Sequence, residues 1–317
     1  MLESFLYLAA GGVLLYAGGE GLVRGAGSLA LRFGMTPFVI GMTIIAFATS
    51  APELAVSLQA AFEGVDDLAI GNVVGSNIAN IGLVLGTAAV IRPAKVEMRL
   101  LRLDLPWLIF VSLLLLAFMQ DGGISRPAGV VFLFGLVLFL VWNIQIARRE
   151  REEERVRNEF EQVVPAAHRA AWIDWLLIGG GTVALVAGGA AFVKGGITLA
   201  TALGVSSALI ALTVVAFGTS LPELATSIVA SIRDAADISV GNVVGSNFFN
   251  ILAVLGLTAM ISPLDRGGIT MADLAIMLMF ALFMVPLILV RRRIGRPEGL
   301  ALLAGYFAYI GWLISQA

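Results

Sequence analysis

Two glutamates, Glu53 and Glu223, lie within long apolar stretches of the sequence, and each directly follows a proline. An ionised carboxylate in hydrocarbon costs at least about 2–3 kcal/mol unless another charge compensates it. No lysine or arginine is expected at the same depth as either residue. A bound cation, or a proton on the carboxyl group, is therefore the expected way to neutralise each glutamate.

The prolines predict an opening of the helix just before each glutamate. Pro52 and Pro222 lack a backbone donor, and their rings crowd the carbonyls of Ala48 and Gly218. Carbonyls freed at membrane depth must face protein or a wet cavity. Together with nearby hydroxyls they form an oxygen-rich shell suited to a hard cation such as Ca²⁺, whose two charges two carboxylates would match. The hydroxyls belong to Thr49, Ser50, Thr219 and Ser220.

A second polar motif follows each glutamate. Asparagine, serine and asparagine recur at i, i+4 and i+8, which places them on one helical face. They are Asn72, Ser76, Asn80, Asn242, Ser246 and Asn250. Glycines in Gly71-x-x-x-Gly75 and Gly241-x-x-x-Gly245 allow close helix contacts. Hydrogen bonding between helices explains the first asparagine of each triplet at least as well as a site role, whereas the deeper four residues are expected to line the site.

Both motifs occur twice, 170 residues apart. Thr49–Ala55 matches Thr219–Ala225, and Gly71–Asn77 matches Gly241–Asn247 without a gap. Between 41–86 and 211–256, 24 of 46 positions are identical. Because the copies begin an odd number of membrane crossings apart, the second enters the membrane in the opposite sense. Such inverted repeats place a substrate site near the bilayer midplane and work by alternating access.

Composition indicates a chain that lies mostly in lipid. Hydrophobic residues make up 59% and charged residues 13%, against about 25% charged in soluble domains. Ten apolar stretches are long enough to span a bilayer. They are 3–31, 37–62, 68–91, 103–120, 125–147, 172–202, 206–232, 238–261, 270–290 and 299–316. The expected fold is an all-α integral membrane protein whose ten transmembrane helices form two inverted repeats of five, with helices 2 and 7 broken.

Charge divides the chain and orients it. Of the lysines and arginines, 17 fall on the side of the 148–171 linker and 3 on the other. The positive-inside rule therefore places that linker in the cytoplasm and both termini outside. We expect a first repeat at 1–147, a cytoplasmic linker at 148–171 and a second repeat at 172–317. The cytoplasmic (inner) membrane of a prokaryote is the expected location.

At these motifs the sequence resembles the sodium/calcium exchanger family of the cation/calcium antiporter superfamily. Members carry G-T-S-x-P-E and G-N-x-x-G-S-N-x-x-N/D patterns in two α-repeats. Both copies are present here, except that the first copy has Ala48 in place of the glycine of G-T-S-x-P-E. The resemblance implies an antiporter that exchanges several Na⁺ for each Ca²⁺ at four sites formed by the second, third, seventh and eighth helices. It also implies that the long first and sixth helices slide across this core.

The resemblance also implies a ligand for each position that matches the family motifs. Glu53 and Glu223, with the carbonyls of Thr49 and Thr219, would hold Ca²⁺. Two outer Na⁺ sites and a middle site would use the remaining matching residues. These are Ser50, Ser220 and the carbonyls of Ala46 and Ala216 for the outer sites, and Ser76, Asn80, Ser246 and Asn250 for the middle site.

One position departs from part of the family. Potassium-dependent exchangers and archaeal relatives tend to have aspartate where this chain has Asn250. Two acids rather than three favour K⁺-independent exchange. The linker is also too short for the large Ca²⁺-sensing domains of animal members, so no such regulation is expected.

Other functions remain as alternatives. Proton/calcium antiport is the nearest, since a buried glutamate can release a cation by taking up a proton, although the proton-coupled branch typically has glutamate where this chain has Ser76 and Ser246. A cation channel could use the same oxygens, but channels favour rings of identical groups. An intramembrane hydrolase would need a base beside Ser50 or Ser220, and the single histidine, His168, lies in the charged linker.

No cofactor is expected, and the ions Na⁺ and Ca²⁺ are the expected substrates. The lipid bilayer is the expected surrounding partner. The near balance of 20 basic and 22 acidic residues gives no reason to expect nucleic-acid binding, and nothing in the sequence implies a protein partner.

Overall fold

The computed structural model describes residues 2–96, 98–150, 170–203 and 216–316. Within these residues the long elements are all helices, of which eight are long and apolar enough to cross a membrane. A ninth span is formed by two helical pieces bent by 41° at a short break. The first half of the chain contains α1 (Leu2–Phe33), α2 (Pro37–Ile40), η1 (Gly41–Ile45), α3 (Ala46–Thr49), α4 (Ala51–Phe62), α5 (Asp66–Ala79), η2 (Asn80–Leu85), α6 (Gly86–Ile91), η3 (Leu100–Asp104), α7 (Leu105–Gln120) and α8 (Arg126–Glu150).

The second half repeats this order. It contains α10 (Ala171–Ala202), α12 (Ala216–Thr219), α13 (Leu221–Ile232), α14 (Ala236–Phe248), η5 (Phe249–Leu255), α15 (Gly256–Ile261), α16 (Met271–Arg291) and α17 (Arg296–Gln316). Nine of the ten expected spans are matched within a few residues at each end. The first part of the seventh expected span, 206–215, lies outside the described residues, as do residues 151–169 of the linker with His168.

The expected breaks in the second and seventh helices are confirmed, and they fall at Ser50 and Ser220. The backbone of Ser50 has φ −82° and ψ 5°, and that of Ser220 has φ −84° and ψ 2°. The following proline then occupies the second position of a new helix, where the missing backbone donor costs nothing because that N–H would have no helical partner. The helices therefore open two residues before the prolines.

Wide π-helical turns interrupt the helices that carry the polar motifs. The turns η1, η2 and η5 lie in the second, third and eighth spans, and η2 begins at Asn80. Such turns are rare and occur frequently at functional sites because they redirect side chains. No sequence pattern predicts these turns.

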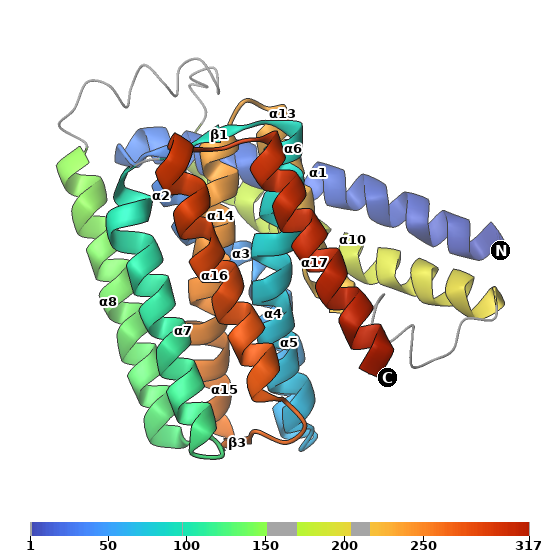
Figure 1. The fold of residues 1–317 in the computed structure, drawn as a ribbon. Helices are drawn as coiled ribbons and strands as arrows, with labels where there is room; N and C mark the ends of the chain where they lie inside the picture. The colour runs from blue at the N-terminus through green and yellow to red at the C-terminus, as the bar shows by residue number, and fades with distance from the viewer. Residues whose placement is uncertain (1, 97, 151–169, 204–215, 317) are drawn as a thin grey trace.

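Two small antiparallel sheets tie the repeats together at opposite ends of the bundle (Figure 1). Strand β1 (Ala94–Lys95) pairs with β4 (Arg293–Ile294), and β2 (Gly123–Ile124) pairs with β3 (Leu264–Asp265). A shift of 170 residues converts β1 into β3 and β2 into β4. The two sheets are therefore the same feature repeated on the two faces of the membrane, as the inverted arrangement requires.

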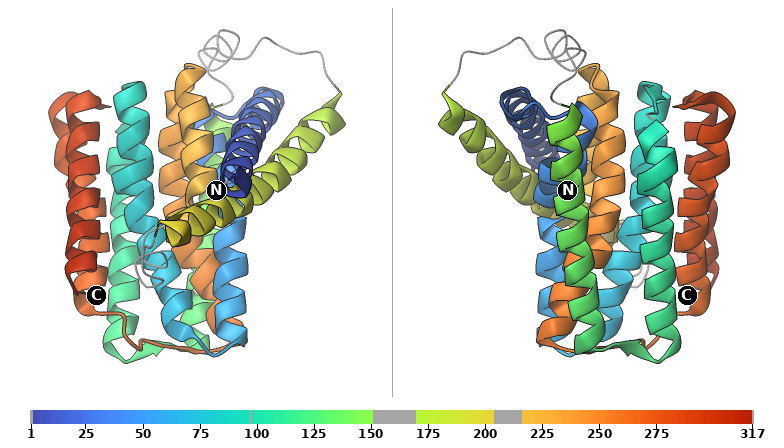
Figure 2. Two further views of the ribbon diagram at one scale, coloured as in Figure 1. Left: turned by 90° about the vertical axis from the view of Figure 1, so that its right-hand side faces the viewer. Right: turned by 90° about the vertical axis from the view of Figure 1, so that its left-hand side faces the viewer.

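The third and eighth spans form the centre of the bundle. In their most apolar windows 78% and 83% of the residues are buried, against 17–39% in the other long spans. The bundle helices α7, α8, α16 and α17 lie around them (Figures 1 and 2). Side chains of the polar motifs are thus held inside protein, away from lipid.

Helices α1 and α10 run side by side, obliquely to the bundle, and project beyond it (Figures 1 and 2). Each has 32 residues, or about 48 Å at 1.5 Å per residue, which far exceeds a hydrocarbon core. They touch through glycines seven residues apart: Gly11 faces Gly188, and Gly18 faces Gly181. The order of these contacts makes the two helices antiparallel.

The glycine contacts predict opposite effects of one methyl group at two positions of α1. A Cβ on Gly18 would lie 2.8 Å from the carbonyl oxygen of Gly181, whereas a Cβ on Gly12 meets nothing within 4 Å. We expect Gly18→Ala to lower the stability by about 1–3 kcal/mol through overpacking. Gly12→Ala should be neutral or stabilising by up to about 1 kcal/mol, since alanine favours helix.

Thermal unfolding of the detergent-solubilised variants, followed by the loss of the monodisperse peak in size-exclusion chromatography, measures this difference. Equal midpoint shifts for the two variants would contradict the close approach of α1 and α10.

Candidate cation-binding site

The breaks place Glu53 and Glu223 in the first turn of α4 and α13. Both side chains are fully buried, at 0% exposure. The N-terminal end of a helix carries a partial positive charge and unpaired N–H groups, which favour a carboxylate there. Each broken helix therefore supplies one acid and part of its electrostatic stabilisation.

The two carboxylates have oxygens that no protein group satisfies. Both side-chain oxygens of Glu53 and Oε2 of Glu223 lack a hydrogen-bond partner among the described residues. The hydroxyl of Ser50 donates to Oε1 of Glu223 at 3.4 Å. Because Ser50 lies three residues before Glu53, this contact brings both carboxylates into one buried cluster. In a buried site such an arrangement requires positive charge from a ligand or proton.

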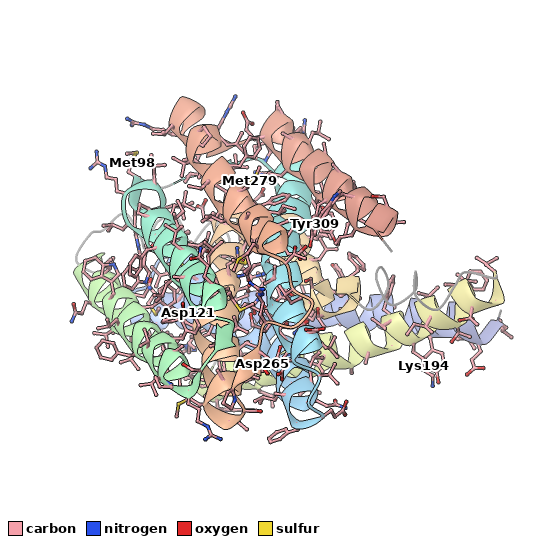
Figure 3. The ribbon with its side chains drawn as sticks, turned by 60° about the horizontal axis from the view of Figure 1, so that its bottom comes forward. Met98, Asp121, Lys194, Asp265, Met279 and Tyr309 are labelled. Atoms are coloured by element: carbon pink, nitrogen blue, oxygen red, sulfur yellow. The ribbon has the colours of Figure 1, made fainter. Side chains whose placement is uncertain are left out.

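The structure buries two further acids that the sequence reasoning did not place at depth. Asp104 pairs with Arg99 at 3.3 Å between Oδ2 and Nε, and Asp174 pairs with Arg32 at 2.7 Å. Within the described part of the chain, neither Glu53 nor Glu223 has such an ion pair. Figure 3 places Lys194 on the projecting part of α10, far from the central helices, where its Nζ contacts the Tyr7 hydroxyl at 2.7 Å.

Hydroxyl groups from the two repeats meet around the carboxylates. Thr49 Oγ1 lies 3.4 Å from Ser246 Oγ, and Ser76 Oγ lies 3.5 Å from Thr219 Oγ1. These two contacts are equivalent under the repeat. The hydroxyl of Ser220 is buried and has no partner among the described residues. The structure thus brings the serines and threonines of both motifs into one cluster.

The deeper asparagines present oxygens to the same region. Asn80 and Asn250 are fully buried, and the Oδ1 atom of each lacks a hydrogen-bond partner among the described residues. Their amide nitrogens are engaged elsewhere. Each asparagine therefore has a free acceptor and an occupied donor, which is the orientation suited to a cation.

The first asparagine of each triplet bonds between helices, in agreement with the alternative raised from the sequence. The amide of Asn72 donates to the carbonyl of Glu53 at 3.1 Å and to Ser57 Oγ at 3.0 Å. The amide of Asn242 donates to Ser227 Oγ at 3.3 Å. These bonds hold the helices with the second motif against the helices with the acids.

The close helix contact expected from the glycines is present in one copy. A Cβ on Gly241 would lie 2.2 Å from the carbonyl oxygen of Phe38, and one on Gly245 would lie 2.4 Å from that of Met42. Helix α14 therefore lies directly on η1. In the other copy, positions 208 and 212, which correspond to Phe38 and Met42 under the repeat, lie outside the described residues.

The carbonyl oxygen of Ala46, one of the two alanines expected at the outer sites, is already hydrogen-bonded within the protein. The carbonyl of Ala46 accepts the backbone N–H of Ser50 at 3.0 Å and the Thr49 hydroxyl at 3.3 Å. Two acceptor positions of this oxygen are thus occupied by protein donors. Ala216 is the first residue of α12. Its carbonyl is a candidate ligand because position 216 corresponds to Ala46 under the 170-residue repeat.

This donor set suits a hard cation. Two carboxylates, amide oxygens and hydroxyls are the ligands of Ca²⁺ and Na⁺ rather than of soft metals. Among the described residues no group of three or more histidine, cysteine, aspartate and glutamate side chains could hold a metal.

Comparison with known proteins agrees with this chemistry. The family model described as sodium/calcium exchanger protein matches residues 3–145 and 173–315. The chain is 34% identical to the inner membrane protein YrbG of Escherichia coli (strain K12), over 99% of this chain and 97% of YrbG. It is 30% identical to the sodium/calcium exchanger MaX1 of Methanosarcina acetivorans, over 97% of both chains.

A solved structure shares the whole architecture. The sodium-calcium exchanger NCX_Mj, soaked with zero Na⁺ and Ca²⁺, superposes with a TM-score of 0.82 at 31% identity, over 98% of this chain and 99% of that one. The fold is that of NCX_Mj, with ten transmembrane helices in two repeats. The two repeats, their breaks and the buried oxygen cluster identify a membrane transporter rather than an enzyme, and the chain belongs to the sodium/calcium exchanger family of cation/calcium antiporters.

Proposed function

We propose that this chain exchanges Na⁺ for Ca²⁺ across the membrane by alternating access, without K⁺. The observation that carries the proposal is the pair of fully buried carboxylates, Glu53 and Glu223, whose free oxygens have no cationic side chain beside them in the described part of the chain. Family membership and the likeness to MaX1 and NCX_Mj support the choice of ions.

Sharing of the carboxylates explains why the ions exchange. Ca²⁺ neutralises both charges, and Na⁺ ions bound at the same oxygens do so as well, so the two kinds of ion exclude each other. A site emptied of both would carry two bare charges through the low-dielectric centre of the protein, at a cost of several kcal/mol for each ion. Only a loaded site can therefore change the side to which it opens, and transport of one ion requires return of the other.

The ligands we propose are the residues at the positions that match the two repeated motifs. Glu53 and Glu223, with the carbonyls of Thr49 and Thr219, would hold Ca²⁺. Ser50 and Ser220, with the carbonyls of Ala46 and Ala216, would hold two outer Na⁺ ions. The middle site would be lined by Ser76, Asn80, Ser246 and Asn250, of which both asparagines have a free amide oxygen among the described residues.

The position of α1 and α10 supports alternating access. Helix α1 packs along α13, whereas the repeat-equivalent contact of α10 with α4 is not similarly extensive. Accordingly Val229 on α13 is buried at 2% exposure against Gly19 of α1, while its equivalent Gln59 on α4 is exposed. In the opposite access state the two repeats would exchange conformations. Helices α1 and α10 would then cover α4 and leave α13 uncovered.

We also propose the orientation and location. The charge distribution places 148–171 in the cytoplasm and both termini outside, with five spans in 1–147 and five in 172–317. In this orientation α4, which α10 covers less than α1 covers α13, forms the outer half of the second span. The likeness to the inner membrane protein YrbG supports a cytoplasmic membrane.

Uptake of ⁴⁵Ca²⁺ into proteoliposomes loaded with Na⁺ and diluted into Na⁺-free buffer tests the exchange. Uptake should require the outward Na⁺ gradient and vanish in Glu53→Gln and Glu223→Gln. Each substitution leaves one charge of Ca²⁺ uncompensated, which should cost at least about 3 kcal/mol, or more than about a hundredfold in affinity. Glu63 is an exposed residue directly after the C-terminal end of α4, the helix that contains Glu53. Glu63→Gln is therefore the matched control and should retain uptake.

The other outcomes of this assay separate the alternatives. Uptake that follows an imposed pH gradient and ignores Na⁺ would show proton coupling. Uptake that needs no counter-ion gradient would show a channel. Either result, or full activity of both glutamine variants, would overturn Na⁺/Ca²⁺ exchange at this site.

Potassium should not take part. Two acids are neutralised by one Ca²⁺, so a K⁺ ion added beside it would leave the buried site with a surplus positive charge, which is costly at membrane depth. We expect K⁺ on either side to change the initial ⁴⁵Ca²⁺ uptake rate by less than about twofold when the membrane potential is clamped. A rate that rises severalfold with K⁺ would contradict this.

Thiol labelling tests which half of the site is uncovered. The chain contains no cysteine, so a single introduced cysteine is a unique probe. In the conformation described, Gln59→Cys should react with a membrane-impermeant maleimide from the outside, and Val229→Cys should be protected from both sides because α1 covers it. Equal reactivity at these equivalent positions would contradict the asymmetric position of α1.

A further inference from the structure

The orientation of the two deep asparagines depends on a second pair of asparagines. The amide of Asn80 donates to Oδ1 of Asn247 at 3.1 Å, and the amide of Asn250 donates to Oδ1 of Asn77 at 3.0 Å. Under the repeat, position 77 corresponds to 247 and position 80 to 250. The same hydrogen bond is therefore made twice, and each time it crosses from one repeat to the other.

All four side chains are removed from solvent, with exposures of 0–2%. A carboxamide has an acceptor end and a donor end of nearly the same shape, so its orientation is set by its hydrogen-bond partners. If Asn80 or Asn250 turned over, its NH₂ group would take the place of the oxygen that a cation needs. The Oδ1 acceptors of Asn247 and Asn77 prevent this because only an NH₂ group can donate to them.

The orientation of Asn77 is itself fixed by its surroundings. Its amide nitrogen lies 3.7 Å from the thioether sulfur of Met277 on α16, which is a weak acceptor and cannot donate. A reversed Asn77 would place oxygen against sulfur and oppose its NH₂ group to that of Asn250. Only one arrangement thus satisfies both amides.

The amide oxygens left free are on the same helices as the hydroxyl cluster. Asn80 and Asn250 each have a buried Oδ1 without a partner among the described residues. Asn80 is one helical turn from Ser76, whose hydroxyl lies 3.5 Å from Thr219 Oγ1 in the hydroxyl cluster. A buried acceptor without a donor is costly unless a ligand satisfies it.

We propose that Asn77 and Asn247 are positioning residues of the cation site, each acting on the asparagine of the other repeat. They touch no ion themselves. They hold the amide oxygens of Asn250 and Asn80 toward the transported cation, and the inference rests on the proposed function in that respect. Partners that orient metal ligands in this way typically change metal affinity about 10–100-fold when removed.

The test measures Ca²⁺ binding by isothermal titration calorimetry of the purified chain in Na⁺-free detergent solution, together with the ⁴⁵Ca²⁺ uptake assay. Asn77→Leu and Asn247→Leu keep the side-chain size but remove the acceptor. We expect each to raise the Ca²⁺ Kd and the KM of uptake about tenfold. Because the acids and the moving helices are unchanged, uptake at saturating Ca²⁺ should change less than about twofold.

Crossed double variants separate positioning from general structural damage. A carboxylate at position 250 presents an oxygen to the ion in either orientation, so Asn250→Asp should largely suppress the effect of Asn77→Leu. It should leave the effect of Asn247→Leu intact. Asn80→Asp should do the reverse. A merely structural role predicts the same loss in every background and a lower midpoint of thermal unfolding.

An unchanged Kd in both folded leucine variants, or losses that no aspartate relieves selectively, would overturn the inference. If a leucine variant does not yield monodisperse protein, Asn77→Ala and Asn247→Ala replace it. These substitutions remove the same hydrogen-bond acceptors with a smaller side chain, and the same changes of Kd and KM are expected. Failure of the proposed function is distinguishable, because wild-type protein would then bind Ca²⁺ with the crossed pattern but show no uptake driven by Na⁺.

Discussion

The rest of the structure depends on two carboxylates that must stay close together inside a protein surrounded by lipid. Ionised acids in such a medium need a cation, and the cation needs several oxygens. Backbone carbonyl oxygens are available to bind an ion only where a helix is interrupted inside the protein. The breaks at Ser50 and Ser220 and the central, most buried position of the third and eighth spans all meet this requirement. Lipid-facing helices need only be apolar and long enough.

Inverted duplication lets one short motif surround an ion from both sides. Each repeat supplies one acid, and the contacts around the acids cross between repeats, as Thr49 with Ser246 and Thr219 with Ser76 show. The same crossing ties the ends of the bundle through the pairs β1–β4 and β2–β3. Neither half contains both acids, so the buried oxygen cluster forms only when the two halves pack together.

Features with a local chemical cause could be predicted from the sequence, whereas features set by distant contacts could not. A proline before a buried glutamate predicts the broken helix, and apolar length predicts the spans. The π-helical turns and the Asn77–Asn250 bond depend on packing between segments far apart in the chain, although the repeat does align Asn77 with Asn247. The pairing of Asp174 with Arg32 likewise brings together residues 142 positions apart, which no local pattern indicates.

The site is nearly symmetric, but its surroundings are not. Arg233, which directly follows α13, pairs with Glu20 of α1, where the repeat-equivalent positions are occupied by Glu63 and Ala190. A perfectly symmetric chain would populate the two access states equally, so residues that differ between repeats must set their ratio. A partly exposed ion pair contributes no more than about 1 kcal/mol, which still changes such a ratio about fivefold. Because this pair lies outside the oxygen cluster, it favours the state in which α1 covers α13 while the ligands of the ion stay the same in both.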